Sequence, residues 1–505
     1  MKVAIRVDAS TRMGIGHLKR CLSLARALGR LDAQVSFVVR DLGLDSSAWV
    51  RGAGFAVFCL PPPSTAAEPI RNDSPAHAGW VVVPQLLDAE QTCAMLEGQA
   101  PDWIVVDSYA FDAHWHERMR QLSGARLCVI DDLADRPLKA ALLVDHNLAA
   151  DHRKKYGSRA IGVDRILGGP RFALLDPSYE QAPVYRFSRE VRSIGIFMGG
   201  TDPWNASEAA VVACRDVAGF AGPIEIAATA ANPHLSSLQA LCATRPGLSL
   251  QLDVPDLSAF FARHDLQIGA GGGAAWERCC IGAPTIAAVM ADNQKASLVE
   301  LAAFGAVCKV DAIDPPSLGR LIAALIEDSA ARAELARCSR QLVDGKGAKR
   351  VALAMMAAAL ELRPATAGDA AVAYTWRNVP ATRRHFRDPS EIGWESHRVW
   401  WSRCLEDPQR RLFVATCGPL EVGILRLDIS RACAEVSLYL DPQLHGLGLG
   451  AALLRASQEW ARDQEPTLEC LTAEVVAGND ASAAAFSAAG FVRAGPQKQL
   501  WEIPR

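Results

Sequence analysis

The sequence predicts an α/β protein with two doubly wound halves built on parallel sheets, followed by a smaller α+β domain. Short apolar runs recur along the first 350 residues, and many end in Asp or Gly before a helix-like segment. The pattern restarts near Val191, which suggests a second half. Beyond about residue 362 apolar and polar residues alternate, as they do in antiparallel strands with one buried face.

The apolar runs of the first part are the expected parallel strands. They lie at 2–8, 35–40, 104–107, 127–131 and 141–144 in the first half, and at 193–198, 224–228 and 266–269 in the second. An irregular stretch at 176–189 precedes the restart, so we expect the halves to be 1–160 and 161–350. A proline-led polar loop at 61–79 reads as a surface excursion. An alanine-rich helical run at 316–362 is broken by a glycine turn at 344–347.

The last part reads as a separate domain, 361–505. Strands at 411–417, 421–429 and 434–440 form an expected antiparallel meander, followed by a glycine turn and a helix at 451–462. A strand at 468–476 and a helix at 480–489 complete it. The change from buried parallel runs to alternating strands predicts a different fold class from that of the first 350 residues.

Composition excludes several classes of protein. The 505 residues are 50% hydrophobic and 22% charged, with a formal net charge of −3. Residues 361–505 hold 16 basic and 18 acidic residues, against 37 and 38 before them, so neither nucleic acid nor an anionic membrane is an expected partner. No apolar run is long enough for a transmembrane helix, and the first residues lack a signal-peptide core, which predicts a cytoplasmic protein. The fourteen scattered cysteines fit neither a zinc site nor a disulfide scaffold, and predict buried thiols in a reducing compartment.

The first candidate site is the turn Gly14-Ile15-Gly16-His17, between the first strand and the first helix. Glycines allow close approach of a ligand, and a helix N-terminus favours phosphate. His17 can accept a proton near neutral pH, and Arg6, Asp8 and Arg20 lie close to it in sequence. From spacing alone, a helix-capping or core histidine is an equally good interpretation of His17.

The second candidate site is the run Gly271-Gly272-Gly273 after the strand at 266–269. Backbone N–H groups of such a turn can cradle a diphosphate. Glu277, one turn into the next helix, is a candidate partner for ribose hydroxyls. Asn293 and Gln294 are expected to line the same crevice, although a polar loop is an equally good interpretation of their composition. A flexible turn with a solvated glutamate is the alternative. No metal-ligand cluster is visible, so no metal is expected.

These motifs resemble the UDP-sugar hydrolases of pseudaminic acid biosynthesis, relatives of the MurG-type GT-B glycosyltransferases. The resemblance covers about residues 1–350, and its most specific part is R-x-D-x-S-x-x-x-G-x-G-H-x-x-R-C from Arg6 to Cys21. Other matching pieces are Asp107-Ser108-Tyr109, Asp131-Asp132, Gly199-Gly200-Thr201-Asp202, Gly271-Gly272 with Glu277, Asn293-Gln294 and Leu342-Val343-Asp344-Gly345-Lys346-Gly347.

The resemblance implies two Rossmann-like halves and release of UDP from UDP-2,4-diacetamido-2,4,6-trideoxy-β-L-altropyranose, in a pathway associated with flagellin glycosylation. Water would attack the anomeric carbon with His17 as base, and Asp8, Arg20 and Tyr109 would hold the sugar or the water. A GT-B glycosyltransferase that uses another acceptor, or a non-catalytic sugar-nucleotide binding protein, remains the alternative.

The third candidate site, Leu440 to Gly450, ends a strand and opens a helix. It resembles the acetyl-CoA loop of GNAT acetyltransferases, R/Q-x-x-G-x-G/A, with His445, Gly448 and Gly450 at the defining positions and Gly446 between them. His445 stands where Arg or Gln is usual, a tolerable change because backbone N–H groups do most of the pyrophosphate binding. Asn479 to Phe491 matches the family's N-x(10)-G-F helix, and Leu362–Ala365 and Trp376–Asn378 resemble amino-sugar and ribosomal-protein acetyltransferases.

This second resemblance spans about 361–495 and is nearest to the N-acetyltransferase of the same pathway, which acetylates the 4-amino group of a UDP-amino-sugar. It implies acetyl-CoA as co-substrate and Asn479 among the cofactor-binding residues. Glu435 and Glu474 are base candidates, although either can be a surface residue of its strand. Trp394, Trp400 and Trp401 are an expected aromatic wall or core residues. Phe486 replaces the tyrosine that usually protonates the departing thiolate. The expected protein is therefore bifunctional.

Overall fold

The central strands β1 (Lys2–Val7), β4 (Trp103–Asp107) and β5 (Arg126–Ile130) of the first sheet are rich in apolar residues and are buried on both faces. A computed structural model describes residues 1–10, 12–62, 75–311, 313–495 and 498–502. The chain forms two compact units, one comprising Lys2–Gly29 and Ala33–Lys349 and the other Arg350–Arg505 with Met1 and Arg30–Asp32. The larger unit holds two parallel sheets and the smaller a mixed sheet. The predicted fold class is confirmed.

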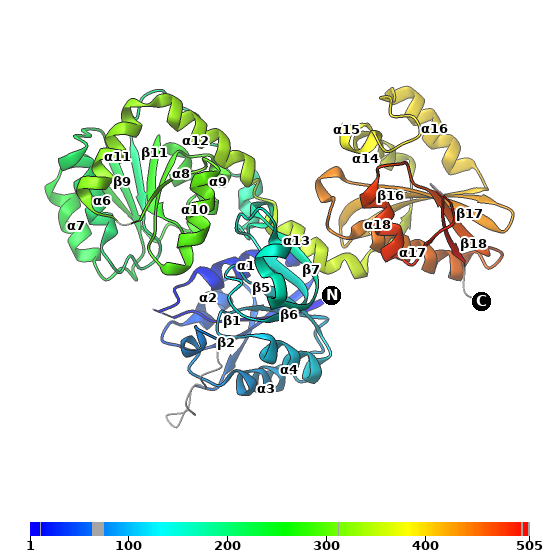
Figure 1. Ribbon diagram of the computed structural model, residues 1–505, viewed down its shortest axis with the longest axis horizontal. Helices are drawn as coiled ribbons and strands as arrows, with labels where there is room; N and C mark the ends of the chain where they lie inside the picture. The colour runs from blue at the N-terminus through cyan, green and yellow to red at the C-terminus, as the bar shows by residue number, and fades with distance from the viewer. Residues whose placement is uncertain (11, 63–74, 312, 496–497, 503–505) are drawn as a thin grey trace. The chain divides into compact units, whose positions relative to one another are not determined.

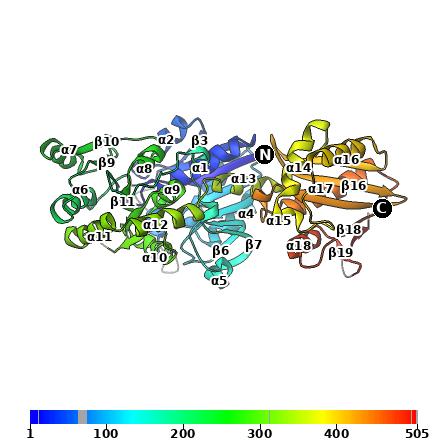
Figure 2. The ribbon, with the colours of Figure 1, turned by 90° about the horizontal axis from the view of Figure 1, so that it is seen from above.

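The first sheet has the order β3-β2-β1-β4-β5-β6-β7, with every pair parallel. Helices lie on both of its faces (Figures 1 and 2). The order reverses direction between β1 and β4, and loops at the carboxyl ends of such neighbouring strands form ligand crevices. The strands are β1 Lys2–Val7, β2 Gln34–Arg40, β3 Ala56–Leu60, β4 Trp103–Asp107, β5 Arg126–Ile130, β6 Leu138–Asp145 and β7 Ala160–Gly168, and the α-helices are α1 Gly16–Gly29, α2 Ser46–Gly52, α3 Gln85–Met95, α4 Ala113–Ser123 and α5 His152–Tyr156.

The second sheet is also parallel and has the order β10-β9-β8-β11-β12-β13, which reverses between β8 and β11. Separate apolar clusters fill its two faces. Its strands are β8 Ile194–Phe197, β9 Ile224–Ala228, β10 Leu248–Leu252, β11 Leu266–Ala270, β12 Thr285–Ala288 and β13 Cys308–Val310, and the α-helices are α6 Ala206–Val212, α7 Leu235–Thr244, α8 Ser258–Arg263, α9 Gly273–Ile281, α10 Lys295–Ala303, α11 Pro315–Glu327 and α12 Ser329–Leu342. Helix α13, Gly347–Met356, follows and includes the boundary between the two units after Lys349.

Close backbone contacts explain why the turn at 344–347 contains two glycines. Gly345 has φ +77°, and a Cβ there would lie 2.5 Å from the carbonyl oxygen of Tyr179. A Cβ on Gly347 would overlap the backbone of Ala173. Only glycine permits these approaches. The turn therefore packs the start of α13 against the segment that follows β7.

The third sheet is mixed, with the order β14-β15-β16-β17-β18-β20-β19. Helices α14–α16 cover one face and α17 and α18 the other (Figure 1). Only β17 and β18 pair in parallel. The strands are β14 Glu361–Pro364, β15 Arg410–Cys417, β16 Leu420–Ser430, β17 Cys433–Leu440, β18 Cys470–Glu474, β19 Val492–Arg493 and β20 Lys498–Glu502, and the α-helices are α14 Ala370–Asn378, α15 Pro380–Arg383, α16 Trp394–Glu406, α17 Leu449–Gln464 and α18 Asp480–Ala488.

The cysteines contradict the sequence interpretation. Cys433 and Cys470 form a disulfide with a Cα–Cα distance of 4.7 Å, because they are register partners at the start of β17 and β18. A separation of 37 residues gave no sign of this pairing. Cys59 is exposed, so not every remaining thiol is buried either.

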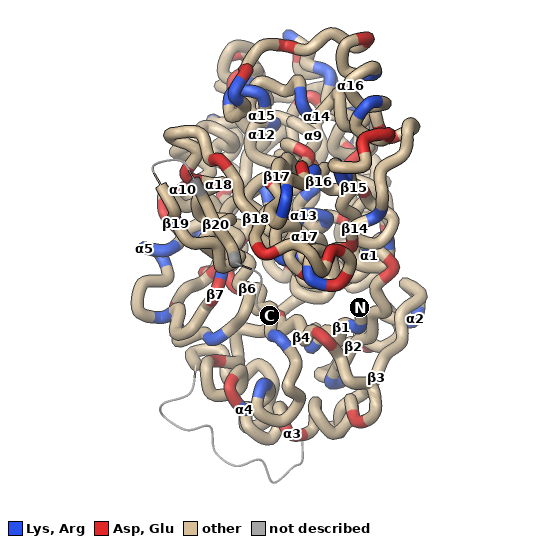
Figure 3. Tube along the Cα trace, turned by 90° about the vertical axis from the view of Figure 1, so that its right-hand side faces the viewer, with Lys and Arg blue, Asp and Glu red and all other residues tan. Residues whose placement is uncertain are grey.

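Other differences concern boundaries. The helical run ends before Glu361, where β14 begins, because residues 361–364 pair with β15. The predicted loop at 61–79 lies largely outside the described residues, and Ala78–Trp80 within it forms a 3-10 turn. Basic and acidic residues are interspersed along the chain (Figure 3), and the formal net charge is −3.

Candidate active sites

The turn after β1 places His17 at the carboxyl edge of the first sheet. Gly14 has φ +74°, and its N–H donates to the carbonyl of Ser10 over 2.8 Å, which closes the turn. Helix α1 then begins at Gly16, so His17 lies in its first turn, with 7% of its surface exposed. A Cβ on Gly14 or Gly16 would meet no atom within 4 Å. The turn is therefore open to a ligand.

His17 is held by a carboxylate from the neighbouring strand. Its Nδ1 lies 2.6 Å from Oδ1 of Asp107, the last residue of β4, which pairs with β1. Arg20 donates to the same carboxylate from Nε over 2.6 Å and from Nη2 over 2.7 Å. Burial by itself would raise the pKa of Asp107, but Arg20 and His17 lower it well below its usual range. Asp107 is therefore an ionised acceptor.

This arrangement fixes the role of each ring nitrogen. A carboxylate only accepts hydrogen bonds, so Nδ1 of His17 carries the proton and Nε2 is the basic nitrogen. Among the described residues, no group forms a hydrogen bond with Nε2. A histidine held by a buried carboxylate with its second nitrogen available is suited to general-base catalysis.

Aromatic side chains surround His17. The rings of His17 and Tyr109 meet edge to face at 4.6 Å between centroids. Tyr109 donates to Asp132, which also accepts from Arg20 Nη1 over 3.1 Å. Burial, and then the charge of Asp132, raise the pKa of Tyr109, so its hydroxyl stays protonated. Trp80 lies 6.4 Å from His17 and 5.8 Å from Tyr109 between ring centroids.

Sequence reasoning missed Trp80 and gave Asp107 and Asp132 no role. Trp80 follows the polar loop and has no helical or strand periodicity around it. The two aspartates end or follow strands, which is the position where ligand-facing side chains collect in parallel sheets. Their position at the ends of strands was the feature of the sequence from which a role for both carboxylates could have been predicted.

Arg6 and Asp8 lie deeper than expected. Arg6 is 1% exposed and donates to Asp8 over 2.5 Å and to Asp88 over 2.6 Å. The second oxygen of Asp8, Oδ2, is buried and has no hydrogen-bond partner among the described residues. The structure therefore brings Arg20 and Tyr109 to His17 but keeps Arg6 in the core beneath Asp8.

The glycine turn of the second half follows β11, beside the reversal point of that sheet. A Cβ on Gly271 would overlap the side chain of Leu298, and one on Gly272 would lie 3.3 Å from Nε2 of Gln294. Gln294 also accepts from the N–H of Met290 over 3.0 Å. Asn293 is exposed. The turn thus needs glycine for packing and lies against Gln294.

Glu277 lies one turn into α9 and is half-buried. Burial raises its pKa, against the opposing charges of Lys19 and Arg278. Lys19 belongs to α1 of the first half. The two halves of the larger unit meet where the Ser297 hydroxyl donates to Oδ1 of Asn147 over 3.3 Å. A second contact joins His146 at the end of β6 to Trp276, with 5.9 Å between ring centroids. Burial lowers the pKa of His146 to about 4, so this histidine is neutral near pH 7.

The third site lies where two parallel strands separate. β17 and β18 pair only from Cys433 to Glu435 and from Cys470 to Thr472, although β17 continues to Leu440. After β17 the chain turns through Gly446 and Gly448, with φ +80° and +76°, into the 16-residue helix α17. His445 is exposed on this turn. A gap between diverging strands that ends at a helix N-terminus fits a long cofactor with a diphosphate.

The local structure explains the presence of Gly450 and of Asn479. A Cβ on Gly450 would lie 3.4 Å from the Cβ of Ala485, so α17 and α18 approach closely there. Asn479 is the N-cap of α18, and its Oδ1 accepts from the N–H of Ser482 over 3.1 Å. Phe486 is 4% exposed and packs edge to face on Phe491 at 4.9 Å.

Glu435 and Glu474 come together from adjacent strands. Arg387 bridges them, with 3.0 Å from its Nη2 to Glu435 and 2.9 Å from its Nε to Glu474. Sequence reasoning proposed both glutamates but missed Arg387, which lies in an irregular segment after α15.

A mainly apolar pocket of about 330 Å³ lies on the same face of β17. Side chains alternate along a strand, so Glu435, Ser437 and Tyr439 share a face, and Ser437 and Tyr439 line the pocket. Trp400 lines it from α16, whereas Trp401 is buried in the core and Trp394 is partly exposed. The remaining lining residues are Arg377, Phe386, Ile392, Ser396, His397, Leu412, Ile424 and Arg426.

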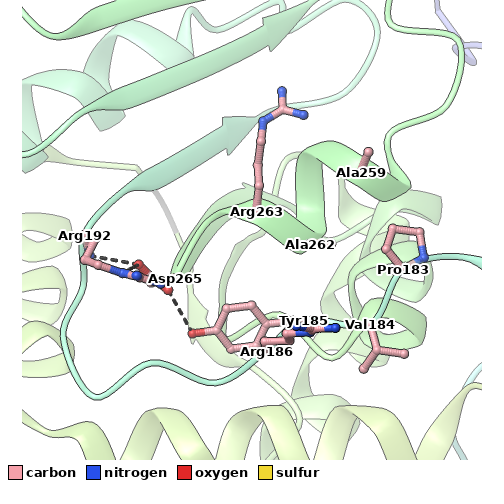
Figure 4. A pocket seen from close by; sticks show the side chains of 9 residues that line it. All are labelled: Pro183, Val184, Tyr185, Arg186, Arg192, Ala259, Ala262, Arg263 and Asp265. Carbon is pink, nitrogen blue, oxygen red and sulfur yellow. Dashed lines mark hydrogen bonds and ion pairs between the residues drawn. The ribbon is translucent and has the colours of Figure 1, made fainter.

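Another pocket, of about 370 Å³, lies in the second half between the segment after β7 and α8 (Figure 4). Tyr185 and Arg192 both point to Asp265, and the Tyr185 hydroxyl donates to it over 3.3 Å. None of the residues that line this pocket belongs to the glycine turns at 14–16, 271–273 and 446–448.

The described part of the chain offers neither a membrane-spanning helix nor a cluster of metal-ligating side chains. None of its helices is long and apolar enough to cross a membrane. In the same described ranges, no group of three or more His, Cys, Asp or Glu side chains is arranged to hold a metal ion.

Comparison with known proteins identifies a family of domains that the smaller unit matches. Residues 359–492 match the model of the acetyltransferase (GNAT) domain. The smaller unit carries a GNAT acetyltransferase domain. The diverging strands, the glycine turn and the pocket beside Glu435 are therefore features of this domain.

The larger unit is similar in sequence to one curated protein and in fold to several solved structures. Spore coat polysaccharide biosynthesis protein SpsG of Bacillus subtilis is 21% identical over 356 residues, which are 70% of this chain and 96% of that protein. Arabidopsis thaliana UGT89C1, solved with quercetin, has a TM-score of 0.51 at 14% identity, over 70% of this chain and 99% of that one. Acinetobacter baumannii MurG has a TM-score of 0.48 at 16% identity, over 70% and 99%. The two parallel-sheet halves form a GT-B fold.

Proposed function

We propose that the chain is a bifunctional enzyme of pseudaminic acid biosynthesis that acts twice on one UDP-linked sugar. The GNAT domain acetylates the 4-amino group of a UDP-amino-sugar, and the GT-B part then hydrolyses UDP-2,4-diacetamido-2,4,6-trideoxy-β-L-altropyranose to UDP and the free sugar. The likeness to a polysaccharide biosynthesis protein and the presence of both domains in one chain support this proposal. The observation that carries the hydrolytic step is the His17–Asp107 pair with Nε2 available.

In the hydrolytic step His17 is the general base. Nε2 accepts a proton from water, whose oxygen attacks the anomeric carbon, and Asp107 stabilises the imidazolium that forms. The bond between the anomeric carbon and the diphosphate oxygen breaks, and its electron pair leaves with UDP. Arg20 and Tyr109 hold the water or the sugar beside His17. The N-terminus of α9 after Gly271 and Gly272 receives the developing negative charge, with Glu277 on the ribose.

In the acetylation step Glu435 is the general base. Arg387 must give up its ion pair for Glu435 to accept a proton from the substrate ammonium, which leaves a nucleophilic amine. Ser437, Tyr439 and Trp400 line the place for the sugar nucleotide. Gly446, Gly448 and the N-terminus of α17 would hold the diphosphate of acetyl-CoA, which supplies the acetyl thioester when bound. Asn479 supports this site by capping α18.

The test is a UDP-release assay with the purified chain. We expect acetyl-CoA consumption with a UDP-4-amino-sugar, followed by UDP release without any added acceptor. UDP release only after an acceptor alcohol is added would instead identify a glycosyltransferase. Binding of UDP with neither reaction would identify a non-catalytic binding protein.

A further inference from the structure

Four arginine side chains in the larger unit are almost completely enclosed, at 0–1% exposure: Arg6, Arg40, Arg278 and Arg332. The other three have more partners than Arg278, although Nε of Arg40 and Nε of Arg332 also have no partner among the described residues. Arg6 and Arg40 donate to the carboxylate of Asp88 over 2.6 and 2.9 Å. Arg332 donates to the backbone carbonyls of Leu325, Ile326 and Arg189.

Arg278 is the one of these four with two unpartnered nitrogens among the described residues. Its Nη2 donates to the carbonyl of Ala270 over 2.6 Å, whereas its Nε and Nη1 are buried and have no partner among the described residues. No carboxylate in the described ranges forms an ion pair with it, and its nearest aromatic partner is Phe261, with 5.6 Å from the guanidinium carbon to the ring centroid. Burying a charge without a partner is costly, so such a charge needs compensation from another source.

The guanidinium is still charged at neutral pH. Burial lowers the pKa of Arg278 to about 10, against the opposing effects of Cys279, Glu277 and Tyr179. Glu277 is the carboxylate that contributes to this effect, and burial raises the pKa of that carboxyl. The fold therefore keeps a cation here with weak internal compensation.

The position of the Arg278 guanidinium indicates which kind of ligand would compensate its charge. Ala270 is the last residue of β11, and Gly271 and Gly272 lead directly into α9, whose nine residues start at Gly273. The N-cap Gly272 supplies no side-chain cap, so the first N–H groups of α9 lack one. A helix N-terminus carries a partial positive charge, which an adjacent guanidinium reinforces. Both positive features lie at one glycine turn, and an anion bound there would compensate both.

We propose that Arg278 is a positioning residue for a diphosphate bound at the turn between β11 and α9. It fixes the carbonyl of Ala270 and adds a buried positive charge behind the turn, and it does so without touching the ligand. This inference rests on the proposed function, because it assigns the diphosphate of a nucleoside diphosphate sugar to that turn. In hydrolysis the same charge stabilises the departing UDP.

The test compares ligands that differ only in the diphosphate. Calorimetric titrations of the full chain with UDP, uridine and inorganic pyrophosphate are done for the native protein, Arg278→Met and Arg278→Lys. Loss of the buried positive charge behind the turn predicts a fall in UDP and pyrophosphate affinity of about 10- to 100-fold in Arg278→Met. Uridine affinity should stay unchanged, and Arg278→Lys should retain most of the preference for UDP.

Arg332→Met is the matched control, because Arg332 is equally buried in the same half but has carbonyl partners. It should lower the melting temperature and leave the UDP-to-uridine affinity ratio unchanged. Equal UDP affinity in Arg278→Met and the native chain would overturn the inference, as would a parallel loss of UDP and uridine binding. Native protein that binds pyrophosphate but not UDP would refute the proposed function and leave the anion site standing.

Discussion

Replacement of Asp107 by Asn tests the proposed base most sharply, because it changes one oxygen to an amide nitrogen and little else. The carboxylate accepts three hydrogen bonds of 2.6–2.7 Å from His17 and Arg20. An amide NH₂ in place of one oxygen favours the other His17 tautomer, with Nε2 protonated and unable to act as base. A buried Asp→Asn change behind a catalytic histidine costs about 10⁴ in kcat. We expect UDP release to fall by about that factor.

The same change also has a stability cost. Removing one partner of a buried ion pair costs about 3–5 kcal/mol. Arg20 keeps Asp132 at 3.1 Å, so we expect a value near 3 kcal/mol and a melting point lower by about 6 °C. The pKa of Asp107 is lowered in the folded state, so its stabilisation is complete above the unfolded pKa of about 3.9 and is lost only as pH falls through the folded value. The charge of Asp107 therefore adds no pH dependence of its own to the stability difference between the two proteins from about pH 5 to 8.

The assay is UDP release with the native protein, Asp107→Asn and Asp102→Asn. Asp102 is the control, because it is an exposed carboxylate just before the same strand and accepts from the N–H of Lys2 over 2.7 Å. UDP binding should survive in all three proteins. Native-rate UDP release by Asp107→Asn would refute the assignment of His17 as an Asp-held base.

Three further changes test other parts of the account. His17→Ala or Gln should abolish UDP release and leave acetyl transfer intact, and native-rate release by the Ala variant would exclude His17 as base. Expressed apart, residues 1–350 and 361–505 should each fold and keep one reaction; aggregation of the second piece would show that β14 is the wrong place to divide the chain. Phe486 has no hydroxyl, so acetyl transfer should be slow, and Phe486→Tyr should keep or raise the rate of CoA release. If both proteins are inactive with several UDP-4-amino-sugars, the domain only binds.

The strands were readable from the sequence because each is a short apolar run bounded by turn residues. β9, at Ile224–Ala228, lies where the pattern placed it, and β4 differs by one residue. Helices α14–α16 were not predicted, because their Trp- and Arg-rich segment lacks a clear apolar period. β3 and β10, with several half-buried or exposed residues, carried a weaker signal than the central strands.

The candidate sites were readable only in part. The glycine turns and His17 can be predicted from the local sequence, because a strand, a glycine and a helix follow one another there. The partner of His17 does not, because Asp107 lies 90 residues away and reaches it only through the pairing of β1 with β4. The disulfide between Cys433 and Cys470 depends in the same way on the pairing of two strands. The unpartnered charge of Arg278 can be recognised only once its surroundings are known.

The central claim is that water, activated by His17, attacks the sugar. It is tested most directly by incubating the chain with UDP-2,4-diacetamido-2,4,6-trideoxy-β-L-altropyranose in H₂¹⁸O and analysing both products by mass spectrometry. The account predicts UDP release without an acceptor, with ¹⁸O in the anomeric hydroxyl of the sugar and none in UDP. Label in the phosphate of UDP, or no UDP release without an acceptor alcohol, would contradict it.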